Sequence, residues 1–288
     1  TRRSSDLPTY DSTVLALEQQ AKALEASATQ AESGNFGTLS QNKQAEAAIV
    51  ASTKALMINY HQLLFNLDLS QKNLILLQDQ QNAVQRKADL GMATQMDVLN
   101  AKSAVENMQA SILSTEKQIR NTRQSMCLAT GWAYNAEPEI GDLPSVSKEE
   151  ILAIDLEADK EEAVKNNYTL SANRHRYSNT RVEETKETLE DTIKNNESQI
   201  RSSVTSSYQA LLQAQSDYEQ AQSELDLAQR QFDTAALNLS IGNVSQLEYD
   251  QQAFALESAK TGLELKQMAV LQAYETYKSG VAGLASAG

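Results

Sequence analysis

Apolar residues recur at spacings of three and four along two long stretches in the first half of this chain. In the first stretch they fall at Leu56, Tyr60, Leu63, Leu64, Leu67, Leu74, Leu77, Val84 and Ala88. In the second they fall at Val98, Leu99, Val105, Met108, Ile112 and Ile119. This periodicity is typical of helices that pack along one seam. It predicts a long helix from about Gln41 to Leu90 and a return helix from about Gln95 to Leu128.

A short turn separates these two helices, and the same turn recurs 151 positions later. The first copy reads Leu90-Gly91-Met92-Ala93-Thr94-Gln95-Met96-Asp97, and the second reads Ile241-Gly242-Asn243-Val244-Ser245-Gln246-Leu247-Glu248. Each copy has a helix-stopping Gly, then Thr or Ser, then an acid three residues further on. That order is typical of a C′ glycine followed by a capping box that starts a new helix. The chain is therefore predicted to contain two long antiparallel helical hairpins.

The remaining segments complete two repeats, residues 1–146 and 147–288, with tips at 91–94 and 242–245. A linker rich in Pro and Gly covers residues 131–147, and Ser147 and Glu150 supply another capping box at its end. Further helices are expected over about 12–32, 148–176, 200–240 and 246–278, with a polar stretch over 177–199. The predicted fold class is all-α, with tandem coiled-coil hairpins.

The composition supports thin helical walls better than a thick globular core. The chain has 288 residues with only 4 Phe and 1 Trp, and much of its 41% hydrophobic share is Ala, which allows helices to approach closely. Repeated units of this kind cannot bury their apolar seams alone, so they must pack against neighbours. The net charge of −13 argues against a nucleic-acid partner, because phosphate binding needs clustered Lys and Arg. No run of about eighteen apolar residues is present to span a bilayer as a helix.

No group of residues in the sequence predicts catalysis, a cofactor or a metal site. His61 and His175 each lack a Glu three residues earlier, so the Glu-x-x-His pattern of di-iron bundles is missing. Two Ser-x-x-Lys matches, at Ser40 and Ser114, lack the companion motifs of the enzymes that use this pattern. The single cysteine, Cys127, is expected to be a small buried hydrophobic residue. We therefore expect no enzymatic activity.

The duplicated turn, with an Asp-Val-Leu-type opening to the return helix in Asp97-Val98-Leu99, resembles the TolC family of outer-membrane efflux channels. The segment Ala163-Val164-Lys165-Asn166-Asn167-Tyr168 also resembles the short repeat-opening helix of that family. The resemblance implies a homotrimer whose hairpins, two per protomer, form a hollow α-barrel of twelve helices. It further implies that the hairpin tips form a closable entrance and meet a periplasmic adaptor, or membrane fusion protein, which connects the duct to an inner-membrane pump.

The sequence departs from the family where its members carry two pairs of β-strands per protomer, inserted before each long helix. Residues 33–40 and 188–199 occupy those places, and neither has the alternating apolar and aromatic run of a lipid-facing strand. We therefore expect short connections here instead of the family's membrane barrel. Either the strands were removed, or this is a relative from an envelope without an outer membrane. The start at Thr1, without an initiator Met, suggests a processed exported protein of the cell envelope or a trimmed piece.

The tips hold the candidate functional residues. By the resemblance, Glu248 and Gln251 match two entrance-lining acidic positions, although Gln251 carries no charge, and Asp97 and Asn100 are the entrance positions of the first tip. Asp97 and Glu248 also fit a plain capping role. The adaptor-contacting residues would be Gly91, Met92, Ala93, Thr94, Gly242, Asn243, Val244 and Ser245. Ala93 and Val244 equally fit hydrophobic staples across the caps. Arg86, Lys87 and Arg230 lie near the tips and could hold the entrance shut by pairing with acids on adjacent helices. A solvated helix face is the commoner explanation of such charges.

Two functions fit these patterns. The first is a passive trimeric export duct, and the second is a structural or adaptor-like bundle in which the four long segments of one chain close on themselves. A duct would have about three times the chain mass of 31.6 kDa, whereas a closed bundle would be a monomer. A pump adaptor would instead need a single hairpin with β-rich flanking domains, which this sequence lacks.

Overall fold

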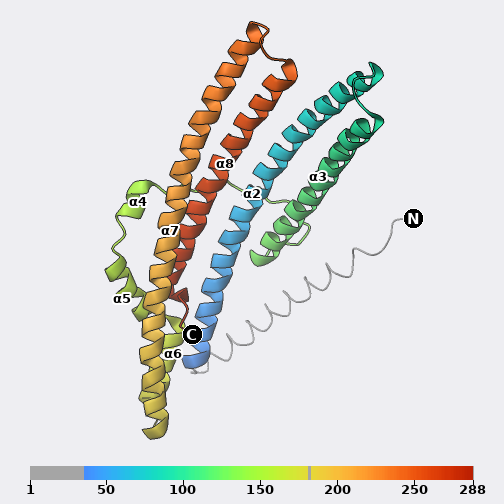
Figure 1. The fold of residues 1–288 in the computed structure, drawn as a ribbon. Coiled ribbons are helices and arrows are strands. Elements are labelled where there is room, and N and C mark those ends of the chain that lie inside the picture. The colour runs from blue at the N-terminus through green and yellow to red at the C-terminus, as the bar shows by residue number, and fades with distance from the viewer. Residues whose placement is uncertain (1–35, 181–182, 288) are drawn as a thin grey trace, which may run out of the picture. The chain divides into compact units, whose positions relative to one another are not determined.

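The computed structural model describes residues 36–180 and 183–287, and these form helices joined by short turns and one linker (Figure 1). No strand occurs in those two ranges. The helix expected over 12–32 lies outside the described residues. The elements are α2 (Phe36–Asp89), α3 (Gln95–Ala129), α4 (Lys148–Leu152), α5 (Leu156–Asn166), α6 (Tyr168–Asn179), α7 (Glu183–Ser240), α8 (Gln246–Ser279) and a π-helical turn η1 (Gly280–Leu284).

The two predicted hairpins, α2 with α3 and α7 with α8, are confirmed, but both long outgoing helices begin earlier than expected. α2 begins at Phe36 instead of Gln41, and α7 begins at Glu183 instead of about residue 200. The segments expected as short connections, 33–40 and 188–199, are therefore helical wherever they are described. The polar composition of 183–199 suggested a loop, yet exposed Glu and Lys are good helix formers, and acids in the first turn of α7 complement the helix dipole.

The single helix expected over 148–176 is also wrong, because the structure has three short helices there. Ser147 caps α4 in the predicted capping box, but Asp155 and Asn167 then start new helices. The Asp155 carboxylate accepts hydrogen bonds from the backbone N–H groups of Glu157 and Ala158, at 3.2 and 3.1 Å. Short polar side chains that bond the backbone in this way end one helix and begin the next.

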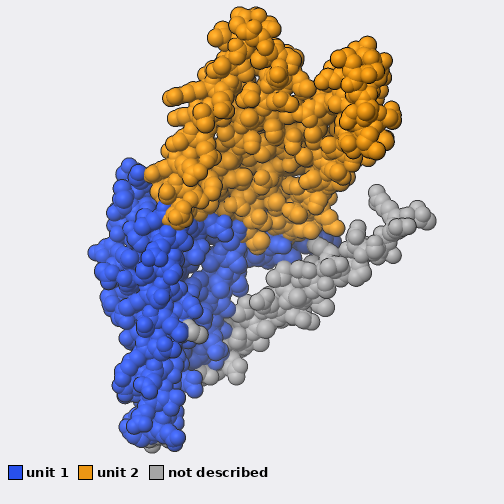
Figure 2. Space-filling view, viewed as in Figure 1, with its two compact units in different colours: residues 1–55, 125–212, 271–288 blue, residues 56–124, 213–270 orange. Residues whose placement is uncertain are grey.

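The chain forms two compact units, each built from segments of both repeats (Figure 2). Unit 1 comprises residues 1–55, 125–212 and 271–288, and unit 2 comprises residues 56–124 and 213–270. The units cut across the sequence repeats because the long helices each contribute to both. Unit 2 contains both hairpin tips.

Unit 1 is held by a small apolar core and by the buried amide of Asn167. The core contains Ala163, Val164, Leu170, Ile200, Val204, Tyr277, Val281, Ala285 and Ala287. Asn167 is buried among them, and its amide nitrogen donates to the carbonyl oxygens of Gly283 at 3.2 Å and Ala285 at 2.8 Å. The same side chain accepts from the backbone N–H of Leu170 at 2.9 Å. One amide thus caps α6 and fixes the chain beyond α8 against it.

Unit 2 is a layer of four helix segments in the order α3, α2, α8, α7 (Figure 1). The tip turns join α3 to α2 and α8 to α7. An ion pair of 2.6 Å between Lys72 and Glu257 joins α2 to α8, and one of 2.9 Å between Lys266 and Asp217 joins α8 to α7. The α3 seam consists of Val98, Val105 and Ile112, which are buried at heptad spacing. Leu99, which we had expected on that seam, is exposed instead.

Candidate functional site: the hairpin tips

Both tips are closed by the same backbone geometry. Gly91 and Gly242 have φ values of 72° and 76°, a backbone conformation that residues with a Cβ rarely adopt. In the first tip, the N–H of Gly91 donates to Ala88 O at 2.9 Å and that of Met92 to Lys87 O at 2.7 Å. The second tip repeats these bonds from Gly242 and Asn243 at 3.0 and 2.8 Å. This is the Schellman motif, so the main chain alone ends each outgoing helix.

The return helices start from the capping boxes that the sequence predicts. The Thr94 N–H donates to the Asp97 carboxylate at 2.8 Å, and the Asp97 N–H donates back to Thr94 Oγ1 at 3.2 Å. Ser245 and Glu248 exchange the corresponding bonds at 2.7 and 3.3 Å. The Thr94 backbone N–H lowers the pKa of Asp97, and the Ser245 backbone N–H lowers the pKa of Glu248. Both acids are therefore ionised at neutral pH and held at the start of a helix.

A groove of about 650 Å³ lies beside the second tip, between α7 and α8. Two of the predicted entrance residues, Glu248 and Gln251, line it together with Val244 of the turn. Arg230 lines the same groove, although its guanidinium forms no ion pair with any described residue. The remaining lining residues are Gln231, Thr234, Ala235, Asn238 and Gln252. The structure thus brings one cation, one acid and several amides together at this tip.

The first tip holds the other predicted residues. Asp97 and Asn100 are exposed on the first turns of α3, and Met92 is 74% exposed in the turn itself. Among the described residues, no hydrogen bond or ion pair connects the first tip to the second. The four predicted entrance positions therefore form two separate pairs within one chain.

Sequence reasoning missed the exposed apolar residues around the tips. Leu90 and Ile241 each precede the turn glycine, and both are exposed, as is Met96 at the start of α3. The repeated placement of a large apolar residue immediately before the glycine was the available signal. Exposed apolar side chains grouped at one end of a structure are typical of a contact surface.

Two hairpins packed in one layer, with matched tips at one end, define a tandem coiled-coil protein of the kind that forms helical walls. No described helix is both long and apolar enough to cross a lipid bilayer. Within the described ranges, no cluster of three or more His, Cys, Asp or Glu side chains has the geometry to hold a metal ion.

The comparisons with solved structures show which proteins share this fold. The chain is similar to the outer-membrane channel OprN, with 10% sequence identity, a TM-score of 0.59, and coverage of 86% of this chain and 69% of that one. It is similar to the outer membrane protein VceC from Vibrio cholerae, with 13% identity, a TM-score of 0.54, and coverage of 86% and 74%. A membrane protein from Pseudomonas aeruginosa matches with 14% identity, a TM-score of 0.57, and coverage of 90% and 72%.

These likenesses show that the chain has the TolC-family fold in its helical part, as the duplicated turn predicted. At the level of sequence, no family model and no curated protein matches the chain. The fold is thus shared with these proteins at only 10–14% sequence identity. Helical seams tolerate such change because they need only apolar residues at the right spacing.

Proposed function

We propose that this chain is one subunit of a passive export duct of the cell envelope. Three copies would place their hairpins side by side and enclose a tunnel of twelve helices. The tips would form its closable entrance and would dock a periplasmic adaptor, which passes cargo from an inner-membrane pump. The proposal assigns the chain no catalytic step. The fold supports it, since the similar structures include outer-membrane channels.

The observation that carries the proposal is the pair of apolar edges on unit 2. In the order α3, α2, α8, α7, the outer helices are α3 and α7. Each exposes large apolar residues, which are Met96, Leu99 and Leu113 for α3, and Leu227, Leu237 and the adjoining Ile241 for α7. At about 100° per residue, each set falls within about 100° of its helix surface. A protein that stayed alone in water would leave both stripes uncovered.

Two different edges favour a ring of copies. If the α7 edge of one copy packs against the α3 edge of the next, every contact is heterologous, and such contacts generate a closed ring when the rotation closes. The four helix segments of one layer then become part of a continuous wall. The Ala-rich composition suits such a wall because it lets neighbouring helices approach closely.

The test is the oligomeric state of the intact chain, measured by size-exclusion chromatography with light scattering. We expect about three times the 31.6 kDa chain mass, and end-on images with threefold symmetry and a central hole. Leu237→Asp should dissociate the trimer by placing a charge on the α7 edge. Leu113→Asp should do the same from the α3 edge.

The matched control is Leu152→Asp on α4. Leu152 is 68% exposed and Leu237 is 63% exposed, so the two substitutions change similarly exposed residues at different positions in the fold. The control should remain trimeric. A wild-type protein that is monomeric and has the helical content of this structure would refute the duct and favour the closed single-chain bundle. Dissociation by the α4 control as readily as by the edge variants would refute the assignment of the edges.

A further inference from the structure

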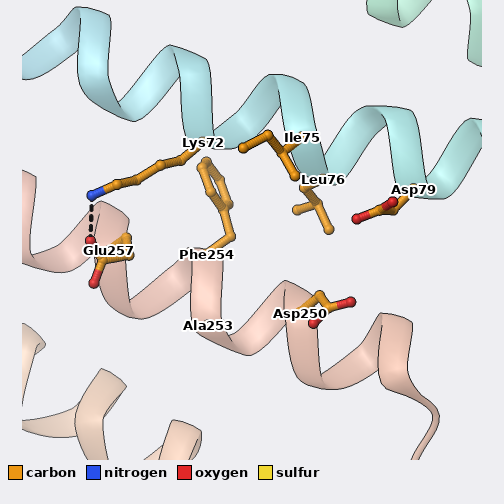
Figure 3. A pocket seen from close by; sticks show the side chains of 8 residues that line it. All are labelled: Lys72, Ile75, Leu76, Asp79, Asp250, Ala253, Phe254 and Glu257. Atoms are coloured by element: carbon orange, nitrogen blue, oxygen red, sulfur yellow. Dashed lines mark hydrogen bonds and ion pairs between the residues drawn. The ribbon is translucent and has the colours of Figure 1, made fainter.

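A second groove, of about 290 Å³, lies between α2 and α8 within unit 2 and belongs to neither tip (Figure 3). Its apolar surface is formed by Ile75 and Leu76 of α2 with Ala253 and Phe254 of α8. Figure 3 shows the Phe254 ring reaching from α8 toward α2, beside Ile75 and Leu76. The volume is at the lower end of the roughly 300–1,000 Å³ of small-molecule sites, so an occupant would be small.

The two ends of this groove carry different charges. At one end, the Lys72 ammonium is neutralised by Glu257 at 2.6 Å and by Asp68 at 2.9 Å. At the other end stand Asp79 of α2 and Asp250 of α8, one on each helix (Figure 3). Asp79 has no ion-pair partner among the described residues, and Asp250 accepts only a neutral hydrogen bond from the Gln246 amide, at 2.8 Å.

The groove therefore has an excess of negative charge beside an apolar surface. One lysine and three carboxylates line it, which gives a formal charge of −2. We propose that this groove binds a small amphipathic organic cation, with its apolar body against Phe254, Ile75 and Leu76 and its ammonium group between Asp79 and Asp250.

The chemistry of the lining selects this class of ligand. An anion would meet two uncompensated carboxylates, and a neutral apolar molecule would leave them without a counter-charge. An organic ammonium is weakly hydrated, so it can approach the carboxylates while its apolar part lies on the ring of Phe254, whose face also attracts cations. As a statement about cargo, the inference rests on the proposed duct, because it names the class of molecule that the duct wall would hold. The binding itself needs only the α2 and α8 segments of unit 2.

The test uses the intact chain at low salt and two probes that share a benzene ring. Benzyltrimethylammonium carries a positive charge and benzenesulfonate a negative one. Binding is measured by isothermal titration calorimetry and by ligand-observed NMR. We expect the cation to bind at least about tenfold more tightly than the anion. Asp79→Asn and Asp250→Asn should each weaken its binding by about threefold to fivefold, as expected for pairing with a partly exposed carboxylate.

The matched control is Asp233→Asn on α7, which removes the same charge from the chain at a residue that does not line the groove. It should leave binding unchanged. Equal affinity for the two probes would overturn the inference, as would weakening by Asp233→Asn as large as that by Asp79→Asn. Binding seen only in a dissociated Leu237→Asp protein would also overturn it, because a neighbouring copy would then cover the groove.

The outcomes separate this inference from the proposed function. A monomeric wild-type chain that binds the cation selectively would support the proposed binding site and refute the proposed duct. A trimer with a central hole that binds the cationic and anionic probes equally would support the proposed duct and refute the proposed binding site.

Discussion

Replacing Gly283 with Ala tests how the end of α8 is fixed in unit 1. Gly283 has a φ of 123° and a ψ of 0°, a conformation that residues with a Cβ rarely adopt. A Cβ built at this position would lie 2.6 Å from the backbone oxygen of Asn166 and 3.0 Å from Cε2 of Tyr168. The neighbouring oxygen belongs to the backbone at the end of α5, so a rotamer change cannot relieve the contact.

The expected cost follows from two effects. Holding a residue with a Cβ in this backbone conformation costs about 1–3 kcal/mol. Forcing an extra methyl group into a packed site costs about another 1–3 kcal/mol. We therefore expect Gly283→Ala to lower the free energy of unfolding by about 2–6 kcal/mol. At about 2–4 °C per kcal/mol for a protein of this size class, the thermal midpoint should fall by about 4–24 °C.

The assay is thermal unfolding followed by far-UV circular dichroism, with Gly262→Ala as the control. Gly262 lies inside α8, and a Cβ there would meet nothing within 4 Å. Because Ala is the better helix former, this control should raise stability by about 0.5–1 kcal/mol. The two variants make the same chemical change and should move the midpoint in opposite directions. A Gly283→Ala protein as stable as the wild type would refute the reasoning.

Three further predictions concern ionisable groups. Lys260 and Lys72 hold the pKa of Glu257 below its usual range, so the Lys72 to Glu257 ion pair stabilises the fold above about pH 4.5 and is lost as pH falls through the lowered pKa. Lys72→Met should therefore cost about 0.5–1 kcal/mol in urea unfolding at pH 7 and less at pH 3, and an equal cost at both pH values would contradict this assignment. Burial and the Asp159 carboxylate, 2.6 Å from the hydroxyl, raise the pKa of Tyr277, so this bond is present at neutral pH and is lost only as pH rises above about 10. Tyr277→Phe should cost about 1–2 kcal/mol at pH 7 in the same assay, and an unchanged midpoint would show that the bond adds nothing. Because the pKa of Glu248 is lowered, its capping bond to Ser245 is progressively lost as pH falls below about 4.5. Amide-exchange protection at the start of α8 should therefore be lower at pH 3 than at pH 6. Equal protection at the two pH values would contradict the capping role.

The hairpins could be predicted from the sequence because each signal for them is local. Gly91 and Gly242 end helices by donating to residues three positions earlier, and the next residue of each turn donates to a residue five positions earlier. Thr94 and Ser245 begin helices through bonds to residues three positions later. Such motifs leave the same sequence pattern wherever they occur. The family resemblance depended on these motifs, and the solved structures confirm the fold that it predicted.

The parts that were missed depend on contacts between residues far apart in the chain. Asn167 was assigned to a helix interior, yet its side chain bonds to Gly283 and Ala285 more than a hundred positions later. The pairing of Lys72 with Glu257 has the same character, since either residue alone is an ordinary charge on a helix surface. Neither contact leaves a local pattern, so neither could be predicted from the sequence. The entrance and adaptor roles of the tip residues remain predictions.

The Schellman motif closes both turns through the backbone, so the side chains of Met92 and Asn243 form none of the bonds that end the helices. Met92 and Asn243 use only their backbone N–H groups to end the preceding helices. Met92 and Asn243 are both exposed, so substitutions there can change the surface of the tips while each hairpin keeps its stability. Under the proposed function, exchanging Met92 with Asn243 would alter what each tip presents to an adaptor in a chain that folds as before.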